Sequence, residues 1–270
     1  MAIRKIIASS IAIAALTAAA PASAIVIGGV DFGPDGASPT NTHIETTTVA
    51  ETFINGSGQT LLGYGQINTV NGNLLYAGTD RLYFTFEYTS QNFSATDVEF
   101  INGTINVYLG ANFNLTSQSS VANLATIQGY SEWVRFTGHD FTATGAELTA
   151  SGDLIGSALS FKGSGLADVD TTGVFGLAAV ASFLDANSIA DSLGGFADIS
   201  VNTSGDNQVL NSHDVTTGCA DGTAAAGTWC ISGSADLRGK TVTVPEPASL
   251  ALLGIGLFGI AAARRNRKAA

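Results

Sequence analysis

The stretch "LYFTFEYT", Leu82 to Thr89, alternates two kinds of side chain with period two. In an extended chain, successive side chains point to opposite faces. One face would carry Leu82, Phe84, Phe86 and Tyr88, and the other Tyr83, Thr85, Glu87 and Thr89. This alternation predicts a half-buried antiparallel β-strand.

Two further stretches repeat the pattern. "TINVYL" (104–109) alternates Ile105, Val107 and Leu109 with polar neighbours and Tyr108, and "ADISVN" (197–202) does the same with Ala197, Ile199 and Val201. Only 12% of residues are charged, too few for the wet faces of long amphipathic helices. With turn signals at 71–73 and 102–104, the sequence predicts a mainly β fold, an antiparallel β-sandwich or jelly-roll-like single domain over 25–243.

The segment 174–195, "VFGLAAVASFLDANSIADSLGG", fits two structures. Its alanine content favours a helix that ends at Gly194. The surrounding β pattern favours two strands joined by a turn at 185–187, and that is the prediction adopted.

Cys219 and Cys230 are the two cysteines of the chain. In an oxidising compartment they predict a disulfide, and the chain-entropy relation gives about 3 kcal/mol of stabilisation for a loop of this size. Their spacing does not suit a redox pair, and two thiols do not complete a zinc site. Trp229 is expected to pack over the bridge.

Residues 1–24 predict a secretory signal peptide. Arg4 and Lys5 precede an apolar run, and Ala22 and Ala24 suit signal peptidase cleavage after Ala24. The Sec machinery and signal peptidase are therefore expected partners.

The C-terminal segment 244–270 combines three features. Pro245, Glu246 and Pro247 form a stiff, extended peptide, because each proline restricts the residue before it. An uncharged apolar run follows, with a predicted transmembrane helix at 249–263. The basic residues after it predict a cytoplasmic end: Arg264, Arg265, Arg267 and Lys268.

This tail resembles a PEP-CTERM sorting signal. The resemblance implies recognition and cleavage by exosortase, a membrane cysteine transpeptidase, in Gram-negative bacteria that make exopolysaccharide and biofilm. "LLGYGQINTVNG" (61–72) and "GGFADISVNTSG" (194–205) resemble flocculation-associated PEP-CTERM proteins. The implied route is transient anchoring in the inner membrane, with the body in the periplasm, and a final place at the cell surface or in the extracellular matrix.

The body predicts little chemistry. Residues 25–244 hold five Lys and Arg against 21 Asp and Glu, a net charge of −16, which disfavours nucleic-acid binding. No nucleophile elbow, metalloprotease motif or phosphate loop occurs, and neither His139-Asp140 nor His213-Asp214 suits a dyad if both residues lie in a strand. "DFGPDG" (31–36) and "SGDNQ" (204–208) fit turns better than calcium loops. No catalytic residue, metal or cofactor is predicted.

Two hypotheses follow. The first is a non-catalytic exported protein associated with exopolysaccharide, biofilm or cell aggregation. Tyr83, Tyr108 and Trp133 could contact sugars, although core packing is the safer role for each. The alternative is a secreted polysaccharide-processing enzyme with two carboxylates facing each other across a deep cleft.

Overall fold

The quoted alternation lies in β6 (Asp80–Gln91), which forms an antiparallel hairpin with β7 (Asp97–Ala111). The structure is a computed structural model, and it describes residues 25–33, 42–208, 210, 213 and 217–242. Leu82, Phe84 and Tyr88 are buried in the main core, while Tyr83 is buried in a separate cluster on the opposite face. Both faces of β6 are therefore covered, which the sequence analysis expected of one face only.

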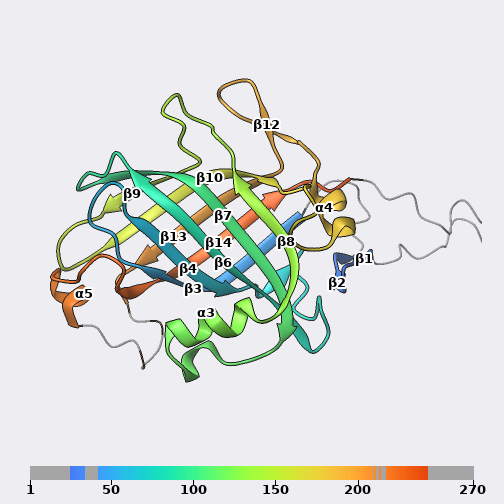
Figure 1. The fold of residues 1–270 in the computed structure, drawn as a ribbon, viewed down its shortest axis with the longest axis horizontal. Helices are drawn as coiled ribbons and strands as arrows, with labels where there is room; N and C mark the ends of the chain where they lie inside the picture. The colour runs from blue at the N-terminus through green and yellow to red at the C-terminus, as the bar shows by residue number, and fades with distance from the viewer. Residues whose placement is uncertain (1–24, 34–41, 209, 211–212, 214–216, 243–270) are drawn as a thin grey trace, which may run out of the picture.

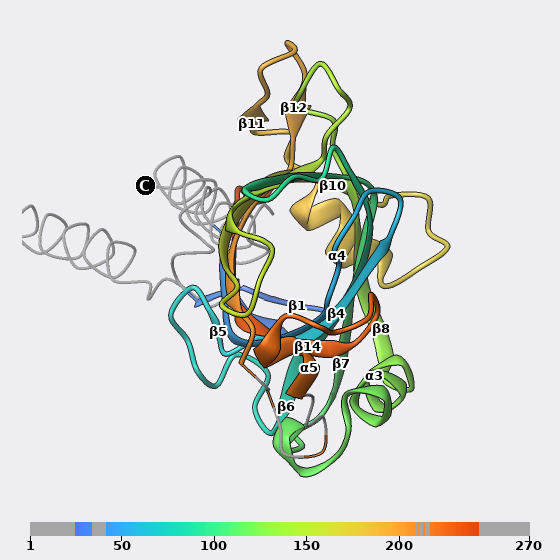
Figure 2. The same ribbon diagram turned by 90° about the vertical axis from the view of Figure 1, so that its left-hand side faces the viewer.

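Eight strands of the main sheet form a closed ring (Figures 1 and 2). The order is β13-β14-β3-β4-β6-β7-β8-β10, and β10 pairs again with β13. The remaining ring strands are β3 (Thr42–Thr52), β4 (Thr60–Gln66), β8 (Ser131–Gly138), β10 (Ser160–Val169), β13 (Ile199–Asp206) and β14 (Trp229–Gly239). Two more strands join this sheet: β5 (Thr69–Val70) pairs with β3, and β9 (Leu148–Asp153) lies between β7 and β10.

The mainly β, antiparallel, single-domain prediction is confirmed, and the sandwich or jelly-roll type is not. One sheet curls into a barrel-like shape and buries its own inner face. The continuous pairing from Ser160↔Asp206 to Ala167↔Ile199 joins its two ends. Period-two alternation requires one buried face, and it is the same whether that face meets a second sheet or curls onto itself.

The two ends of the ring differ. The end here called the α4 end is covered by α4 (Ala178–Leu184) and by the pair β1 (Val26–Ile27) and β2 (Val30–Asp31). Phe32 packs edge-on against Phe183, with ring centroids 4.9 Å apart. The opposite end, the α5 end, carries the hairpin loops 53–59, 92–96 and 154–159 and α5 (Thr217–Asp221). Figure 2 looks into the α5 end, with α4 visible through the ring.

The segment 174–195 combines both structures considered for it. The strand prediction is wrong for 178–184, which form α4, with Val180, Phe183 and Leu184 buried. It is confirmed in part farther on, where Asn187 has the positive φ of a turn and β11 (Ile189–Ala190) pairs with β12 (Phe196–Ala197). Its buried face packs on the end of the barrel, and its exposed face carries only the small, uncharged residues Ala178, Ala179 and Ser182.

A second helix, α3 (Ser120–Gln128), lies on the outer surface of the barrel after the short 3-10 helix η1 (Leu115–Ser117) (Figure 1). Tyr64 of β4 donates to Ser120 Oγ at 2.9 Å, and Asn123 Nδ2 donates to the Tyr64 hydroxyl at 2.8 Å. No prediction was made for this segment, although Ser119 provides an N-cap. The helices of the described part are all too short to traverse a bilayer.

The two turn signals have different outcomes. Asn71 and Gly72 both have positive φ and form a turn after β5, as predicted. The prediction at 102–104 is wrong, because Asn102 and Gly103 lie inside β7. They stand where the register shifts, between the pairs Glu87↔Thr104 and Thr89↔Ile101. A residue of positive φ builds a bulge as readily as a turn, and the pairing partners decide between them.

Gly103 leaves room for the Tyr88 ring. A Cβ atom at Gly103 would lie 2.0 Å from Tyr88 Cε1, whereas at Gly56 the nearest atom would be Gln59 Nε2 at 3.4 Å. We predict that Gly103→Ala lowers the free energy of unfolding by about 1–3 kcal/mol through overpacking. Gly56→Ala, the control, should be neutral or slightly stabilising. Denaturant unfolding measures both, and equal stability of the two variants would contradict the assigned packing.

Candidate functional site

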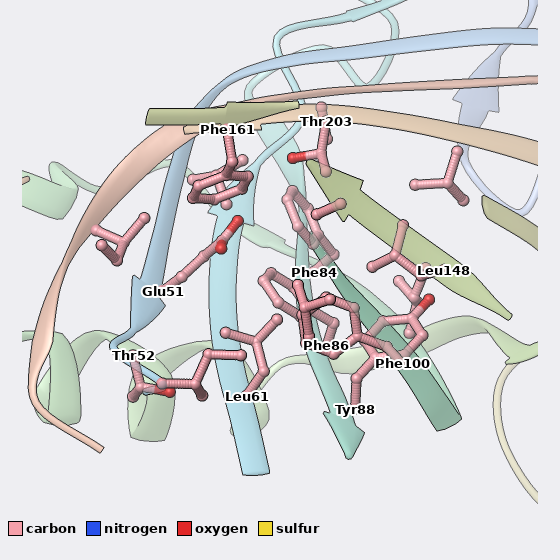
Figure 3. A pocket seen from close by; sticks show the side chains of 18 of the residues that line it. Glu51, Thr52, Leu61, Phe84, Phe86, Tyr88, Phe100, Leu148, Phe161 and Thr203 are labelled. Carbon is pink, nitrogen blue, oxygen red and sulfur yellow. The ribbon is translucent and has the colours of Figure 1, made fainter. Parts of the chain in front are cut away.

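The ring of strands encloses an apolar cavity of about 100 Å³ (Figure 3). Aromatic and aliphatic side chains of the inner face form most of its wall. Ile54, Phe93 and Phe161 of this wall are half-buried and Asp153 is exposed, so the cavity reaches the surface at the α5 end. It is the candidate binding site of the body.

Large and small residues alternate around the inner face. The Phe86 ring occupies the place of a side chain at Gly63, where a Cβ would lie 1.9 Å from Phe86 Cζ. The Phe161 ring lies over Gly205 in the same way, at 2.6 Å. Small barrels commonly fill their interiors by such pairing of large with small residues.

Glu51 of β3 is the buried carboxyl group of this cavity. It is 5% exposed and pairs in register with Gly63. Figure 3 shows its carboxyl group projecting from β3 toward Phe161. Within the described residues the Glu51 carboxyl has no hydrogen-bond partner, and burial raises its pKa from an ordinary 4.5 to about 7.

The two threonines of the wall already use their hydroxyl groups. Thr52 Oγ1 accepts from the Leu62 amide at 2.9 Å, and Thr203 Oγ1 donates to the Ser234 carbonyl at 3.0 Å. Tyr88 is buried, and desolvation raises the pKa of its hydroxyl, with a further rise from the charge of Glu147. Among the described residues of the wall, Glu51 therefore offers an acceptor that no other protein group uses.

Glu51 was not among the residues predicted from the sequence. In "TVAETF" it stands two residues after Val49, on the face that also carries that apolar side chain. A charged residue on an otherwise apolar strand face was the one feature of the sequence that could have indicated a buried carboxyl group. With 21 acidic residues in the body, the pattern alone could not separate it from surface carboxylates.

We predict that Glu51 makes stability depend on pH. Since its pKa is higher in the folded state, the unfolded chain loses this proton first, and the free energy of unfolding falls as pH rises from about 4.5 to 7. Above about pH 7, the free energy of unfolding is about 3 kcal/mol lower because of Glu51 than it is below pH 4.5. Glu51→Gln should remove it, whereas Glu87→Gln, at an exposed position of β6, should keep it.

Denaturant unfolding of the exported protein at pH 5 and pH 8 gives the comparison. If wild type and Glu51→Gln change equally between the two pH values, the assigned environment of Glu51 is wrong.

A second polar cluster surrounds His139 outside the barrel. Its Nδ1 lies 2.8 Å from Asp168 Oδ2 and its Nε2 lies 2.7 Å from Asp191 Oδ2. Burial lowers the pKa of His139, but the hydrogen bonds and charges of Asp191 and Asp168 outweigh it, so the pKa lies above its ordinary value. Hydrogen bonding to His139 also lowers the pKa of Asp191, to about 2.

This cluster fastens the β11–β12 segment to the barrel wall. Asp191 follows β11, its Oδ1 accepts from the amides of Leu193 and Gly195, and Asp168 lies in β10. Both ring nitrogens of His139 are thus engaged by carboxylates, and neither is Asp140, its neighbour in "GHDF". A tether is the role that this geometry supports.

We predict that His139→Ala loosens this segment. The pKa of His139 is higher in the folded protein than its ordinary 6.5. The protonated imidazole therefore contributes its full stabilisation below pH 6.5, and this contribution is lost as pH rises through the pKa of His139 in the folded protein. Amide hydrogen exchange over 189–197 should rise roughly tenfold or more at pH 6, with exchange in β6 unchanged. Unchanged exchange over 189–197 would contradict the tether.

Other predicted residues have clear positions. Cys219 and Cys230 form the predicted disulfide, which packs with Phe53 and Leu159 at the α5 end. The prediction for Trp229 is wrong: because neighbouring strand residues face opposite ways, it packs on Tyr64, with ring centroids 5.3 Å apart.

The three aromatic residues considered for sugar contact are all buried. Tyr83 and Trp133 are fully buried and Tyr108 is 6% exposed, so core packing, the safer of the two roles, is confirmed. The Trp133 indole donates to the Gly28 carbonyl at 3.1 Å.

The two acidic loops contain turns where the structure describes them. Asp31 accepts from the Gly33 amide at 2.7 Å, and Asp206 accepts from the Gln208 amide at 2.9 Å. Within the described ranges, no group of three or more His, Cys, Asp or Glu side chains is arranged to hold a metal ion.

The predicted export and sorting segments lie outside the described residues. These are the signal peptide with Ala22 and Ala24, the motif Pro245, Glu246 and Pro247, the helix at 249–263, and the basic residues Arg264, Arg265, Arg267 and Lys268. Sequence comparison bears on the C-terminal segment alone, and the signal peptide stays a prediction.

In a comparison with protein families, residues 243–268 match the PEP-CTERM protein-sorting motif. The chain is a PEP-CTERM sorting domain-containing protein. The motif implies an exported protein processed by an exosortase, with a C-terminal tail that is transiently anchored. No curated protein and no solved structure matches this PEP-CTERM chain, so the function of its barrel-like body must be argued from the residues themselves.

Proposed function

We propose that this protein is a non-catalytic component of the cell surface or extracellular matrix, associated with exopolysaccharide, biofilm or cell aggregation. The observation that carries the proposal is the sorting motif at 243–268, on a body whose closed sheet has an apolar interior. Exosortase acts on the tail, and the body is the part that would remain outside.

The surface of the body supports a matrix role. Its net charge of −16 keeps it soluble and repels other acidic proteins. The disulfide at the α5 end suits an oxidising compartment. Exposed apolar side chains, among them Leu193 and Phe196 near the tip of the β11–β12 segment, are available for contact with other matrix components.

The second candidate is a secreted polysaccharide-processing enzyme. One observation favours it: Glu51 and Asp153, one buried and one exposed, line the same cavity. A sugar ring presents hydroxyl groups that need polar partners, and the apolar wall offers few, so the non-catalytic role has the better support.

Deletion of 244–270 tests the proposed function in the producing bacterium. We expect the deleted protein to leave the cell-surface fraction and cell aggregation to fall, because the body loses its sorting signal. Deletion of Ala269 and Ala270 alone, beyond the basic residues, is the matched control and should change neither.

Two measurements separate sorting from matrix association. Fractionation with immunoblotting locates each variant, and enzymatic digestion of the exopolysaccharide should release the wild-type protein from cells. If digestion releases none and aggregation is the same in all strains, the matrix role fails while exosortase sorting stands.

A further inference from the structure

We propose that the barrel interior binds one small primary amine with an apolar body, whose ammonium group pairs with the Glu51 carboxylate while its hydrocarbon part lies between Phe86 and Phe161. This inference concerns the cavity and does not depend on the proposed matrix role.

The position of Glu51 favours a cationic ligand. An unpaired buried carboxylate is costly, and proteins usually pair such a group or place it on the surface. Here the carboxyl group faces a cavity, 5% exposed, with no hydrogen-bond partner among the described residues. A ligand cation would supply the missing partner.

The chemistry of the wall suits a cation with a hydrocarbon part. Aromatic rings attract a cation placed over their faces, and Phe86, Phe161 and Tyr88 all line the cavity (Figure 3). Hydrocarbon contacts suit the rest of the ligand. An anion such as a fatty acid would meet Glu51 with like charge, whereas a cation is attracted by both features.

The charge around the opening of the cavity also favours a cation. Asp153 is exposed where the cavity reaches the surface, and the whole body carries net charge −16. A field of this sign raises the local concentration of cations at the opening and lowers that of anions.

Size limits the ligand. An engineered cavity of about 150 Å³ accommodates benzene, so a volume near 100 Å³ corresponds to about four carbon atoms. n-Butylamine is therefore the probe, with 1-butanol and butyrate as matched molecules of the same length that are neutral or anionic.

The experiment is an NMR titration of the isotope-labelled exported protein. We expect n-butylamine to bind at least tenfold more tightly than 1-butanol or butyrate at pH 8, with shifts concentrated on residues of the cavity wall. Glu51→Gln should weaken amine binding at least tenfold, while Glu87→Gln, which lies outside the cavity wall, should stay within about twofold of wild type.

A second measurement varies the pH. Amine affinity should rise from pH 5.5 to 8, because burial raises the pKa of Glu51 to about 7 and the ammonium pairs with the ionised form. Asp153 and Tyr88 are the other titratable groups of the described wall, and Asp153→Asn should keep this pH dependence.

Butyrate or 1-butanol binding as tightly as n-butylamine would overturn the proposal. So would amine binding to a folded Glu51→Gln protein with wild-type affinity, or a wild-type affinity that does not change between pH 5.5 and 8.

Discussion

The pairing of β10 with β13 is the constraint on which this structure depends. Eight registered pairs, from Ser160↔Asp206 to Ala167↔Ile199, join the two ends of the sheet. Without them, the chain would have two open edges and an inner face that needs a separate covering layer. With them, the sheet covers itself, and a cavity exists because the ring of eight strands surrounds it.

Closure also decides how the interior is filled. β6 and β7 contribute large side chains, and β4, β10, β13 and β14 contribute glycines at facing or neighbouring positions, such as Gly63 beneath Phe86 and Gly205 beneath Phe161. The high glycine content of the chain, 32 residues, thus has a packing role as well as its role in turns. The space left beside Glu51 is what remains after the aromatic rings are accommodated.

The two ends of the barrel are closed to different extents. The α4 end is filled by α4 and by the β1–β2 segment, where Phe32, Trp133 and Phe183 pack together. The α5 end has loops, a disulfide and partly exposed lining residues, so any exchange between cavity and solvent takes place there. The sorting motif lies in a third region, 243–268, outside the described residues.

The sequence by itself determined the sorting class and the strand class. The tail motif is local and contiguous, so comparison recognises it without a structure, and the alternation in "LYFTFEYT" marks a strand because side-chain direction depends only on the local backbone. The disulfide between Cys219 and Cys230 followed from there being two cysteines.

Only the tertiary structure decided the closed sheet, the bulge at Asn102, the helix α4 and the place of Glu51. Each depends on a contact with a residue elsewhere in the chain. The four contacts, in the same order, are Ser160 with Asp206, Gly103 with Tyr88, Phe183 with Phe32, and Glu51 with Gly63. Local alternation shows that a face is buried, but the identity of the covering group comes from contacts between residues far apart in the chain.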